Sequence, residues 1–256
     1  MLFLLSPAKK LEYDTPLHTQ LHSDPIFVKQ SKQLIAELKP KSAAEIAKLM
    51  TLSPALAQLN VDRYVQWVPK STQKNARPAI LAFNGDVYEG LEASTLNDKD
   101  LDWAQEHVVI LSGLYGALRP LDLMQPYRLE MGTKLSNPAG KNLYEFWKLH
   151  IAPYLNERQV ADKKPVIINL ASEEYFKSVD ISTLNARVFQ CVFKEGRVGI
   201  FKIVSFYAKR ARGLMTRFAI EHRAKTPEDL KAFNQEGYVY QPDLSTTDKL
   251  VFHRST

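Results

Sequence analysis

Basic side chains crowd into one stretch of this sequence, and their chemistry is that of a phosphate-binding surface. Residues 194–225 contain nine lysines and arginines but only two glutamates, so this stretch has a net charge of +7. The whole chain of 256 residues has a formal net charge of +6, which leaves the remaining residues at −1. A positive field confined to one stretch attracts a polyanion such as nucleic acid.

The spacing of apolar residues places this positive charge on one side of a helix. Over residues 202–223 they recur at i, i+3, i+4 and i+7, the pattern of a helix that packs on a core. The predicted buried stripe is Tyr207, Ala208, Ala211, Leu214, Met215, Phe218 and Ala219. The cations on the opposite side are Lys209, Arg210, Arg212, Arg217 and Arg223. We expect Gly213 to let a phosphate approach the backbone there; the alternative is a solvated helix face without a ligand.

A second set of chemically useful residues follows four short apolar runs, at residues 2–5, 79–83, 108–111 and 166–170. Each run is typical of a buried strand, and small polar residues follow it at once. If the strands are neighbours and run the same way, their loops meet at the edge where open α/β sheets bind ligands. An enzyme acting on a nucleotide or a phosphorylated small molecule could use four residues of these loops, Ser6, Asp86, Ser172 and Lys177. No Ser/His/Asp order, Walker loop or zinc signature occurs, so this alternative depends on residue types alone.

The segment 112–132 also mixes cations with aromatic rings. Arg119 is followed by Pro120, and Arg128 lies two residues after Pro126, so a proline restricts the backbone near each arginine. Rigid arginines suit bidentate contacts to phosphate. Tyr115 and Tyr127 could stack on a base or bind a sugar. The alternative is that the two arginines pair with Asp122 and Glu130 and brace a long loop.

Several of these segments resemble the YaaA family of bacterial peroxide-stress proteins, also called UPF0246. The matching blocks are SPAK (6–9), AFNGDVY (82–88), residues 112–132, INLASEEYFKSV (168–179) and SFYAKRARGLM (205–215). The resemblance covers nearly the whole chain. It implies a cytoplasmic protein that limits unincorporated iron during hydrogen peroxide stress and protects DNA and protein from oxidative damage. It also implies an α/β fold with a helix-hairpin-helix element and a basic cleft that binds double-stranded DNA with little sequence preference.

The resemblance also assigns residues to this cleft. Those within the matching blocks are Lys9, Arg119, Arg128, Lys177, Lys209, Arg210 and Arg212. The helical pattern adds Arg217, and Tyr115 or Tyr127 would contact a base or sugar. The helix-hairpin-helix element is expected at residues 43–65.

The elements that must position these residues form one α/β domain over residues 1–256. We predict a mixed sheet flanked by helices, with a small helical, helix-hairpin-helix-like subdomain at 31–67 between the first two strands. In that subdomain Ser42 and Glu45 form a capping box that starts a helix. Two short helices around a tight connection could hold a phosphate, and ordinary helical packing is the alternative. Residues 187–193 and 199–206 are typical of a hairpin leading into the basic helix.

Composition narrows the remaining classes of protein. The single cysteine, Cys191, excludes an internal disulfide and suits a reducing compartment. The apolar run 1–5 stops at Ser6 with no basic region before it, which is typical neither of a signal peptide nor of a membrane span. The six histidines are scattered and no Glu-x-x-His pair occurs, so we expect no metal site and no cofactor. The sequence favours a cytoplasmic DNA-binding protein over an enzyme, with no membrane or protein partner evident.

Overall fold

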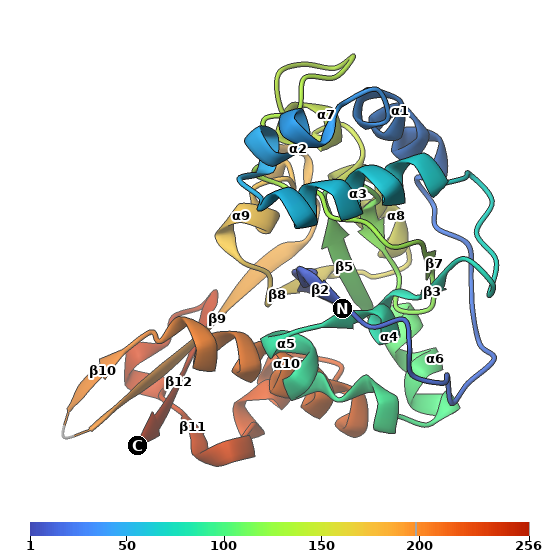
Figure 1. The fold of residues 1–256 in the computed structure, drawn as a ribbon. Coiled ribbons are helices and arrows are strands. Elements are labelled where there is room, and N and C mark those ends of the chain that lie inside the picture. Colours follow the sequence, from blue (N-terminus) through green and yellow to red (C-terminus); the bar gives the residue numbers. More distant parts are fainter. Residues whose placement is uncertain (198, 256) are drawn as a thin grey trace.

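A mixed β-sheet runs through the computed structural model, which describes residues 1–197 and 199–255 (Figure 1). Within these residues the sheet has eight strands in the order β11-β12-β9-β8-β1-β5-β6, and β10 pairs with β9. The strands are β1 (Leu2–Leu5), β5 (Val108–Ser112), β6 (Gly116–Leu118), β8 (Val166–Asn169), β9 (Arg187–Arg197), β10 (Ile200–Lys202), β11 (Tyr238–Tyr240) and β12 (Lys249–Ser255). Helices flank the sheet, so the predicted fold class is confirmed.

The order of the strands reverses at β1. β1 lies between β5 and β8 and is parallel to both, with Phe3 opposite Val108 on one side and Ile168 on the other. All residues of β1 and β5 are buried, as expected for parallel strands covered on both faces. The chain passes from β1 to β5 and β6 and then returns to β8 on the opposite side of β1. The crevice between the carboxyl ends of β1 and β8 is therefore a topological switch point.

Two small sheets bring further loops to this region. β2 (Lys10–Leu11) pairs with β4 (Phe83–Asn84), and β3 (Arg77–Pro78) pairs with β7 (Leu123–Met124). The predicted strand at 79–83 is wrong, because Ala79–Ala82 forms the short helix α4. All four of its residues are buried, so the apolar run shows no periodicity that could separate a strand from a helix. The β2–β4 pair nevertheless carries residue 84 to the loop that follows β1.

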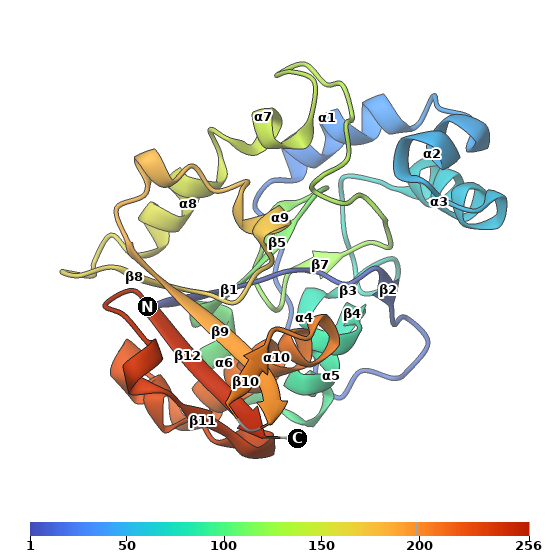
Figure 2. The same cartoon turned by 90° about the vertical axis from the view of Figure 1, so that its left-hand side faces the viewer.

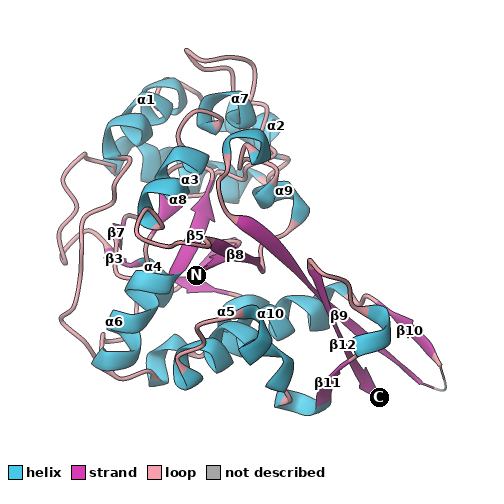
Figure 3. Cartoon of the chain, turned by 180° about the vertical axis from the view of Figure 1, so that it is seen from behind, coloured by secondary structure: helices cyan, strands magenta, loops and turns pink. Residues whose placement is uncertain are grey.

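The helices gather at two ends of the molecule. Besides α4, the α-helices are α1 (Val28–Leu38), α2 (Ala43–Met50), α3 (Pro54–Gln66), α5 (Asp86–Leu91), α6 (Asp98–His107), α7 (Leu143–Trp147), α8 (Ile151–Arg158), α9 (Glu173–Phe176) and α10 (Ser205–His222). Short 3₁₀ helices are η1 (Ala93–Thr95), η2 (Ile181–Thr183), η3 (Pro227–Ala232), η4 (Gln235–Gly237) and η5 (Pro242–Leu244). Figures 1 and 3 show α1, α2, α3 and α7 at one end, and α5, α6 and α10 at the other.

The segment 31–67 contains the expected pair of short helices. The capping box is confirmed, because the Ser42 amide donates to Glu45 Oε2 at 2.8 Å and the Glu45 amide donates to Ser42 Oγ at 3.3 Å. α2 ends at Thr51, which has a left-handed φ of 54°, and Ser53 caps the start of α3. Ile46 and Tyr64 lie in the core, so the pair packs on the body of the protein.

The basic helix α10 follows the β9–β10 hairpin, as predicted, and Figure 2 shows it beside β9 and β10. β9 extends to Arg197, whereas residues 205 and 206 belong to the helix and not to a strand. The predicted stripe is buried except at its first residue, Tyr207, which is 39% exposed. One face of that ring is covered by the guanidinium group of Arg254, at 4.7 Å from the ring centroid.

Gly213 marks a close helix crossing and not an approach for phosphate, which corrects the prediction. A Cβ atom at Gly213 would lie 1.8 Å from the carbonyl oxygen of Val87 in α5. A Cβ at Gly90 of α5 would lie 2.3 Å from the carbonyl oxygen of Arg210. The two helices touch backbone to backbone, which only glycine allows at these positions. α5 therefore occupies the space that a ligand would need.

No helix formed by residues 1–197 and 199–255 combines the length and the apolar character that crossing a membrane requires.

Candidate functional site

A cavity of about 470 Å³ opens at the switch point, beside the carboxyl ends of β1 and β8. Its lining comes from residues 6–10 after β1, residues 84–88, residues 127–130, the segment around α9 (Ser172, Glu174 and Tyr175) and Lys209 and Arg212 of α10. Three of the four predicted loops, those after residues 5, 83 and 170, thus meet at one place. The edge of the sheet at which they meet is the one where open α/β sheets bind ligands.

Two serines join the loops across the switch point. The Ser172 amide donates to Ser6 Oγ at 2.8 Å, and the Ser6 hydroxyl donates to Ser172 Oγ at 3.2 Å. The Tyr88 hydroxyl donates to the Ser6 carbonyl oxygen at 3.0 Å, which fixes the loop after β1 against α5. The hydroxyl groups of neighbouring strands are therefore held next to each other within the cavity.

Arg212 reaches the cavity from α10. It also lines a second cavity of about 320 Å³, beside the end of β8 and the middle of β9, so its side chain lies between the two spaces. Burial lowers the pKa of its guanidinium group. Within residues 1–197 and 199–255, no carboxylate forms an ion pair with Arg212 and no acceptor receives a hydrogen bond from its side chain. A largely buried cation without a counter-charge is costly, and an anionic ligand would relieve that cost.

Three other cations of the cavity form ion pairs with carboxylates of its lining. Lys9 Nζ lies 3.1 Å from Glu130, Arg128 lies 2.9 Å from the same carboxylate, and Lys209 Nζ lies 3.5 Å from Asp86. The side chains of Lys9 and Lys209 are 65% and 51% exposed. Exposed pairs of this kind contribute only about 0.2–1 kcal/mol each, so the lysines can exchange their carboxylates for phosphate.

The chain was compared with known proteins. A protein-family model described as "Peroxide stress protein YaaA" matches residues 1–244. The chain belongs to the YaaA family. The UPF0246 protein of Bordetella avium is 68% identical over 254 residues, covering 99% of both chains, and that of Bordetella pertussis is 65% identical over the same coverage. The UPF0246 protein of Polaromonas sp. is 60% identical over 99% of this chain and 98% of its own. The family resemblance of the sequence is confirmed.

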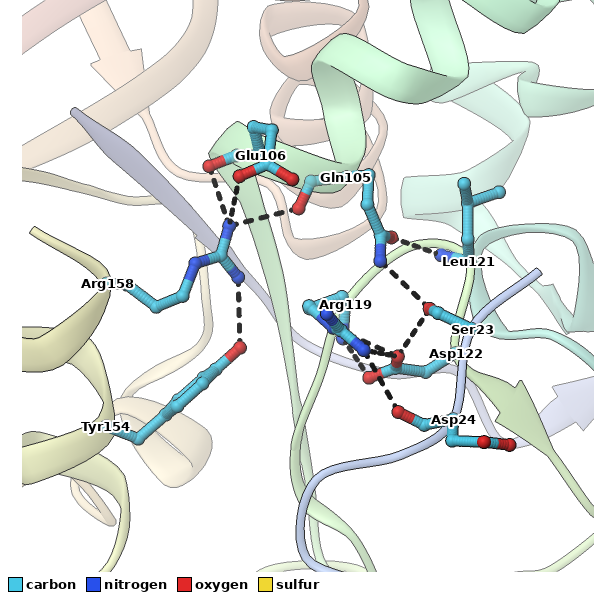
Figure 4. A network of polar contacts seen from close by, with 9 residues as sticks. All are labelled: Ser23, Asp24, Gln105, Glu106, Arg119, Leu121, Asp122, Tyr154 and Arg158. Atoms are coloured by element: carbon cyan, nitrogen blue, oxygen red, sulfur yellow. Dashed lines mark hydrogen bonds and ion pairs between the residues drawn. The ribbon is translucent and has the colours of Figure 1, made fainter. Parts of the chain in front are cut away.

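Arg119 of this YaaA-family chain lies away from the cavity, in a network of its own (Figure 4). Its Nε and one terminal nitrogen donate to Asp122 Oδ1 at 3.1 and 2.9 Å, and the same nitrogen donates to the Asp24 carbonyl oxygen at 3.0 Å. Asp122 is fully buried and also accepts from Ser23 at 2.7 Å. Arg119 pairs with Asp122 and Arg128 pairs with Glu130, as the alternative in which these pairs brace a loop predicts.

The predicted basic face of α10 divides into two faces. Lys209 and Arg212 are three residues apart and both reach the cavity, whereas Arg210 and Arg217 are seven apart and point elsewhere. Arg210 pairs with Glu236 at 2.6 Å. Arg217 pairs with Glu221 at 2.6 Å and donates to the carbonyl oxygens of residues 91 and 92 at the end of α5, at 3.3 and 3.0 Å. Both arginines are thus paired with carboxylates of the same chain.

The remaining predicted residues of the YaaA-family cleft fall in different environments. Lys177 lies outside the cavity lining, with its Nζ 5.4 Å from the centre of the Tyr144 ring. Tyr115 is 1% exposed, and its hydroxyl accepts from Trp67 Nε1 and the Gln125 amide at 3.0 and 3.1 Å. It has no surface left on which a base could stack. Tyr127 is buried too but contributes to the cavity wall, and its hydroxyl bonds Ser112 Oγ at 2.6 Å.

The residues of the enzymatic alternative are largely brought together. Ser6, Asp86 and Ser172 all line the cavity, and Lys177 does not. Sequence reasoning missed Tyr88 and Glu174, both of which line it. Each lies within two residues of a predicted position. Their places in the segments that follow predicted strands could therefore have identified them. Glu174 accepts from the Gly132 amide at 2.9 Å, which fastens the segment after Arg128 to the loop after β8.

The α2–α3 pair supplies no residue to the cavity lining, but it supports one wall. The Tyr64 hydroxyl of α3 hydrogen-bonds the carbonyl oxygen of Arg128. Across residues 1–197 and 199–255, no group of three or more His, Cys, Asp or Glu side chains is placed to hold a metal ion.

Proposed function

We propose that this peroxide stress protein binds double-stranded DNA, without sequence preference, across the mouth of the switch-point cavity. The observation that supports the proposal is the convergence of Lys9, Lys10 and Lys209, from the loop after β1 and from α10, on one opening. Their side chains are exposed, and the two that form ion pairs are held by weak contacts with solvent access. Duplex DNA offers closely spaced phosphates to which such lysines can turn while releasing counterions.

DNA binding would connect to peroxide stress through iron. Fe²⁺ held by DNA phosphates reacts with peroxide and produces radicals next to the strand. A cationic protein that covers phosphates displaces Fe²⁺ from them and so limits unincorporated iron where it does most damage. Equal rates of peroxide nicking of iron-loaded DNA, with and without saturating protein, would rule out this link.

A titration of labelled duplex at several salt concentrations tests DNA binding. Each phosphate contact contributes about 0.9 log unit of affinity per log unit of salt. The triple variant Lys9→Ala, Lys10→Ala, Lys209→Ala should therefore flatten the salt dependence by about two to three contacts. A matched control removes the same charge at the opposite edge of the sheet, with Lys163→Ala, Lys164→Ala and Lys249→Ala, which precede or begin β8 and β12. The proposal fails if both triple variants show the same slope.

Turnover of a nucleotide or phosphorylated small molecule is the second candidate function. It is supported by the meeting of Ser6, Asp86 and Ser172 in one cavity. Because Asp86 holds Lys209 at 3.5 Å, it could act as a base or set the position of that cation. The Asp86→Asn variant should then lose all turnover of phosphorylated substrates and keep its duplex affinity. Binding of duplex without turnover of any nucleotide by the wild type would leave DNA binding as the function.

A further inference from the structure

The interior of the switch-point cavity has a chemistry of its own, distinct from the lysines at its mouth. Arg212 reaches this interior from α10 and forms no ion pair with a carboxylate of residues 1–197 and 199–255. An arginine offers a planar set of donors that matches two oxygens of a phosphate or carboxylate. The Arg212 donors lie beside an open cavity, whereas those of Arg119 lie against the carboxylate of Asp122. The arrangement is that of a prepared anion site.

The serine pair supplies a further donor. Ser6 Oγ accepts from the Ser172 amide, and its own hydroxyl hydrogen is directed to Ser172 Oγ. A hydroxyl group has a single hydrogen to donate, and that of Ser172 meets no acceptor in the described part of the chain. Its hydrogen can therefore point into the cavity. A tetrahedral anion could accept from this hydroxyl and from the Arg212 guanidinium together.

The charge of the lining selects among anions. The described lining residues include five cations and three carboxylates: Lys9, Lys10, Arg128, Lys209 and Arg212, with Asp86, Glu130 and Glu174. The excess of two positive charges matches a phosphate monoester, which has a charge of about −1.5 to −2 at pH 7. A phosphodiester in a DNA strand or a single carboxylate has one negative charge and would leave part of this excess uncompensated.

The rest of the cavity suits an organic group attached to that phosphate. The rings of Tyr88, Tyr127 and Tyr175 line it together with Val87 and Leu129. Burial raises the pKa of each of the three phenols, so all three are neutral at physiological pH. The volume of about 470 Å³ lies within the range of sites for small ligands, about 300–1,000 Å³.

We propose that the switch-point cavity binds a phosphate monoester, with Arg212 and the Ser172 hydroxyl on the phosphate oxygens and the tyrosine rings against the attached organic group. The inference goes beyond duplex binding at the cavity mouth and requires no turnover. The monoester could belong to a free molecule such as a nucleoside monophosphate or to the phosphorylated end of a DNA strand. Both offer the same group to Arg212.

Calorimetric titration of the full chain with AMP, ribose 5-phosphate and adenosine tests the proposal. We expect saturable binding of a phosphorylated probe, no binding of adenosine, and a Kd at least tenfold weaker for the Arg212→Met variant. The matched control is Arg187→Met, which removes an exposed arginine at the start of β9, outside the cavity. Ser172→Ala is a smaller change that should weaken binding about threefold to tenfold. A Kd for AMP and ribose 5-phosphate that neither variant alters would overturn the proposal.

A second arm distinguishes the source of the phosphate. Blunt duplexes that differ only in a 5′-phosphate or a 5′-hydroxyl end are compared on wild type and on Arg212→Met. A preference for the phosphorylated end that Arg212→Met abolishes identifies the DNA end as the source. If the free probes do not bind and the two duplexes bind equally, the proposal is wrong. Arg212→Met separates this result from duplex binding, because it should lose the monoester response and keep its affinity for a duplex with 5′-hydroxyl ends.

Discussion

Arg119 and Arg212 are both partly buried arginines, yet the protein surrounds them in opposite ways. Burial disfavours the Arg119 cation, but the charge and hydrogen bonds of Asp122 more than compensate, and the pKa of Arg119 is raised. At Arg212 burial prevails and lowers the pKa, and no carboxylate of residues 1–197 and 199–255 forms an ion pair with it. Figure 4 shows the contacts of Arg119 with Asp122 and with the carbonyl oxygen of Asp24. A guanidinium that the fold has satisfied maintains structure, and one left without an anion beside a cavity is available to a ligand.

The other cations also differ in how firmly carboxylates of the fold hold them. Arg210 and Arg217 are held by Glu236 and Glu221 and stay part of the fold. Lys9 and Lys209 are paired only at exposed positions and can exchange partners. The local net charge of a sequence segment therefore overestimates the charge that a polyanion can use. Four predictions test whether pairing with a carboxylate decides the role of each cation.

The largest effect is expected at the Arg119 network. Asp122→Ala leaves the Arg119 guanidinium partly buried without its carboxylate, and the free energy of unfolding should fall by about 3–5 kcal/mol. Urea unfolding measures this loss. The double variant Arg119→Met, Asp122→Ala removes both charges and should recover part of the stability. A loss below about 1 kcal/mol in Asp122→Ala would show that the network is not structural.

The reactivity of Cys191 tests whether Arg212 activates this neighbouring thiol instead of binding a ligand. Both line the second cavity, and burial raises the pKa of Cys191 to about 12. Only about 10⁻⁵ of the thiol is ionised at pH 7, against a few per cent for a free cysteine. Iodoacetamide should modify the folded protein at least ~100-fold more slowly than the urea-unfolded protein. Rapid modification that Arg212→Met slows would instead make Arg212 an activator of the thiol.

Arg217 should give an intermediate effect, on stability alone. Its guanidinium caps the end of α5 through the carbonyl oxygens of residues 91 and 92 and also bonds Thr95 Oγ1 at 2.6 Å. Arg217→Met keeps much of the apolar stem and removes these bonds, which should cost about 1–2 kcal/mol in thermal or urea unfolding. The salt dependence of duplex binding should not change. A flatter salt dependence would place Arg217 in the DNA interface.

The smallest effect on stability is expected for Arg212→Met. Because the substitution removes a charge that the fold does not compensate, the free energy of unfolding should change by less than about 1 kcal/mol or rise. Urea unfolding without ligand measures it, with Asp122→Ala as the contrasting variant. A loss near that of Asp122→Ala would mean that Arg212 is as structural as Arg119, and the comparison would fail.

The sequence predicts those parts of the site that depend on patterns within single segments of the chain. Ser6 and Ser172 follow apolar runs that are parallel neighbours, so their meeting follows from the rule for strand ends. Lys209 and Arg212 share a helix face because they are three residues apart. The helix at 79–82 was missed because a short run buried on all sides has no periodicity to reveal its conformation. Gly213 was misjudged because its crossing partner, α5, is more than a hundred residues away.

By itself the amino-acid sequence determined the family, the α/β class, the basic helix and the loops that gather at the switch point. Patterns over a few residues and long matching blocks are enough for these. Only the tertiary structure decided which cations are available, because ion pairing depends on which carboxylate lies within about 4 Å and on how much water surrounds the pair. The sequence offers Asp122 as a partner for Arg119 but does not decide whether either arginine is free to bind a ligand. Their roles differ because folding placed a buried aspartate beside one and an open cavity beside the other.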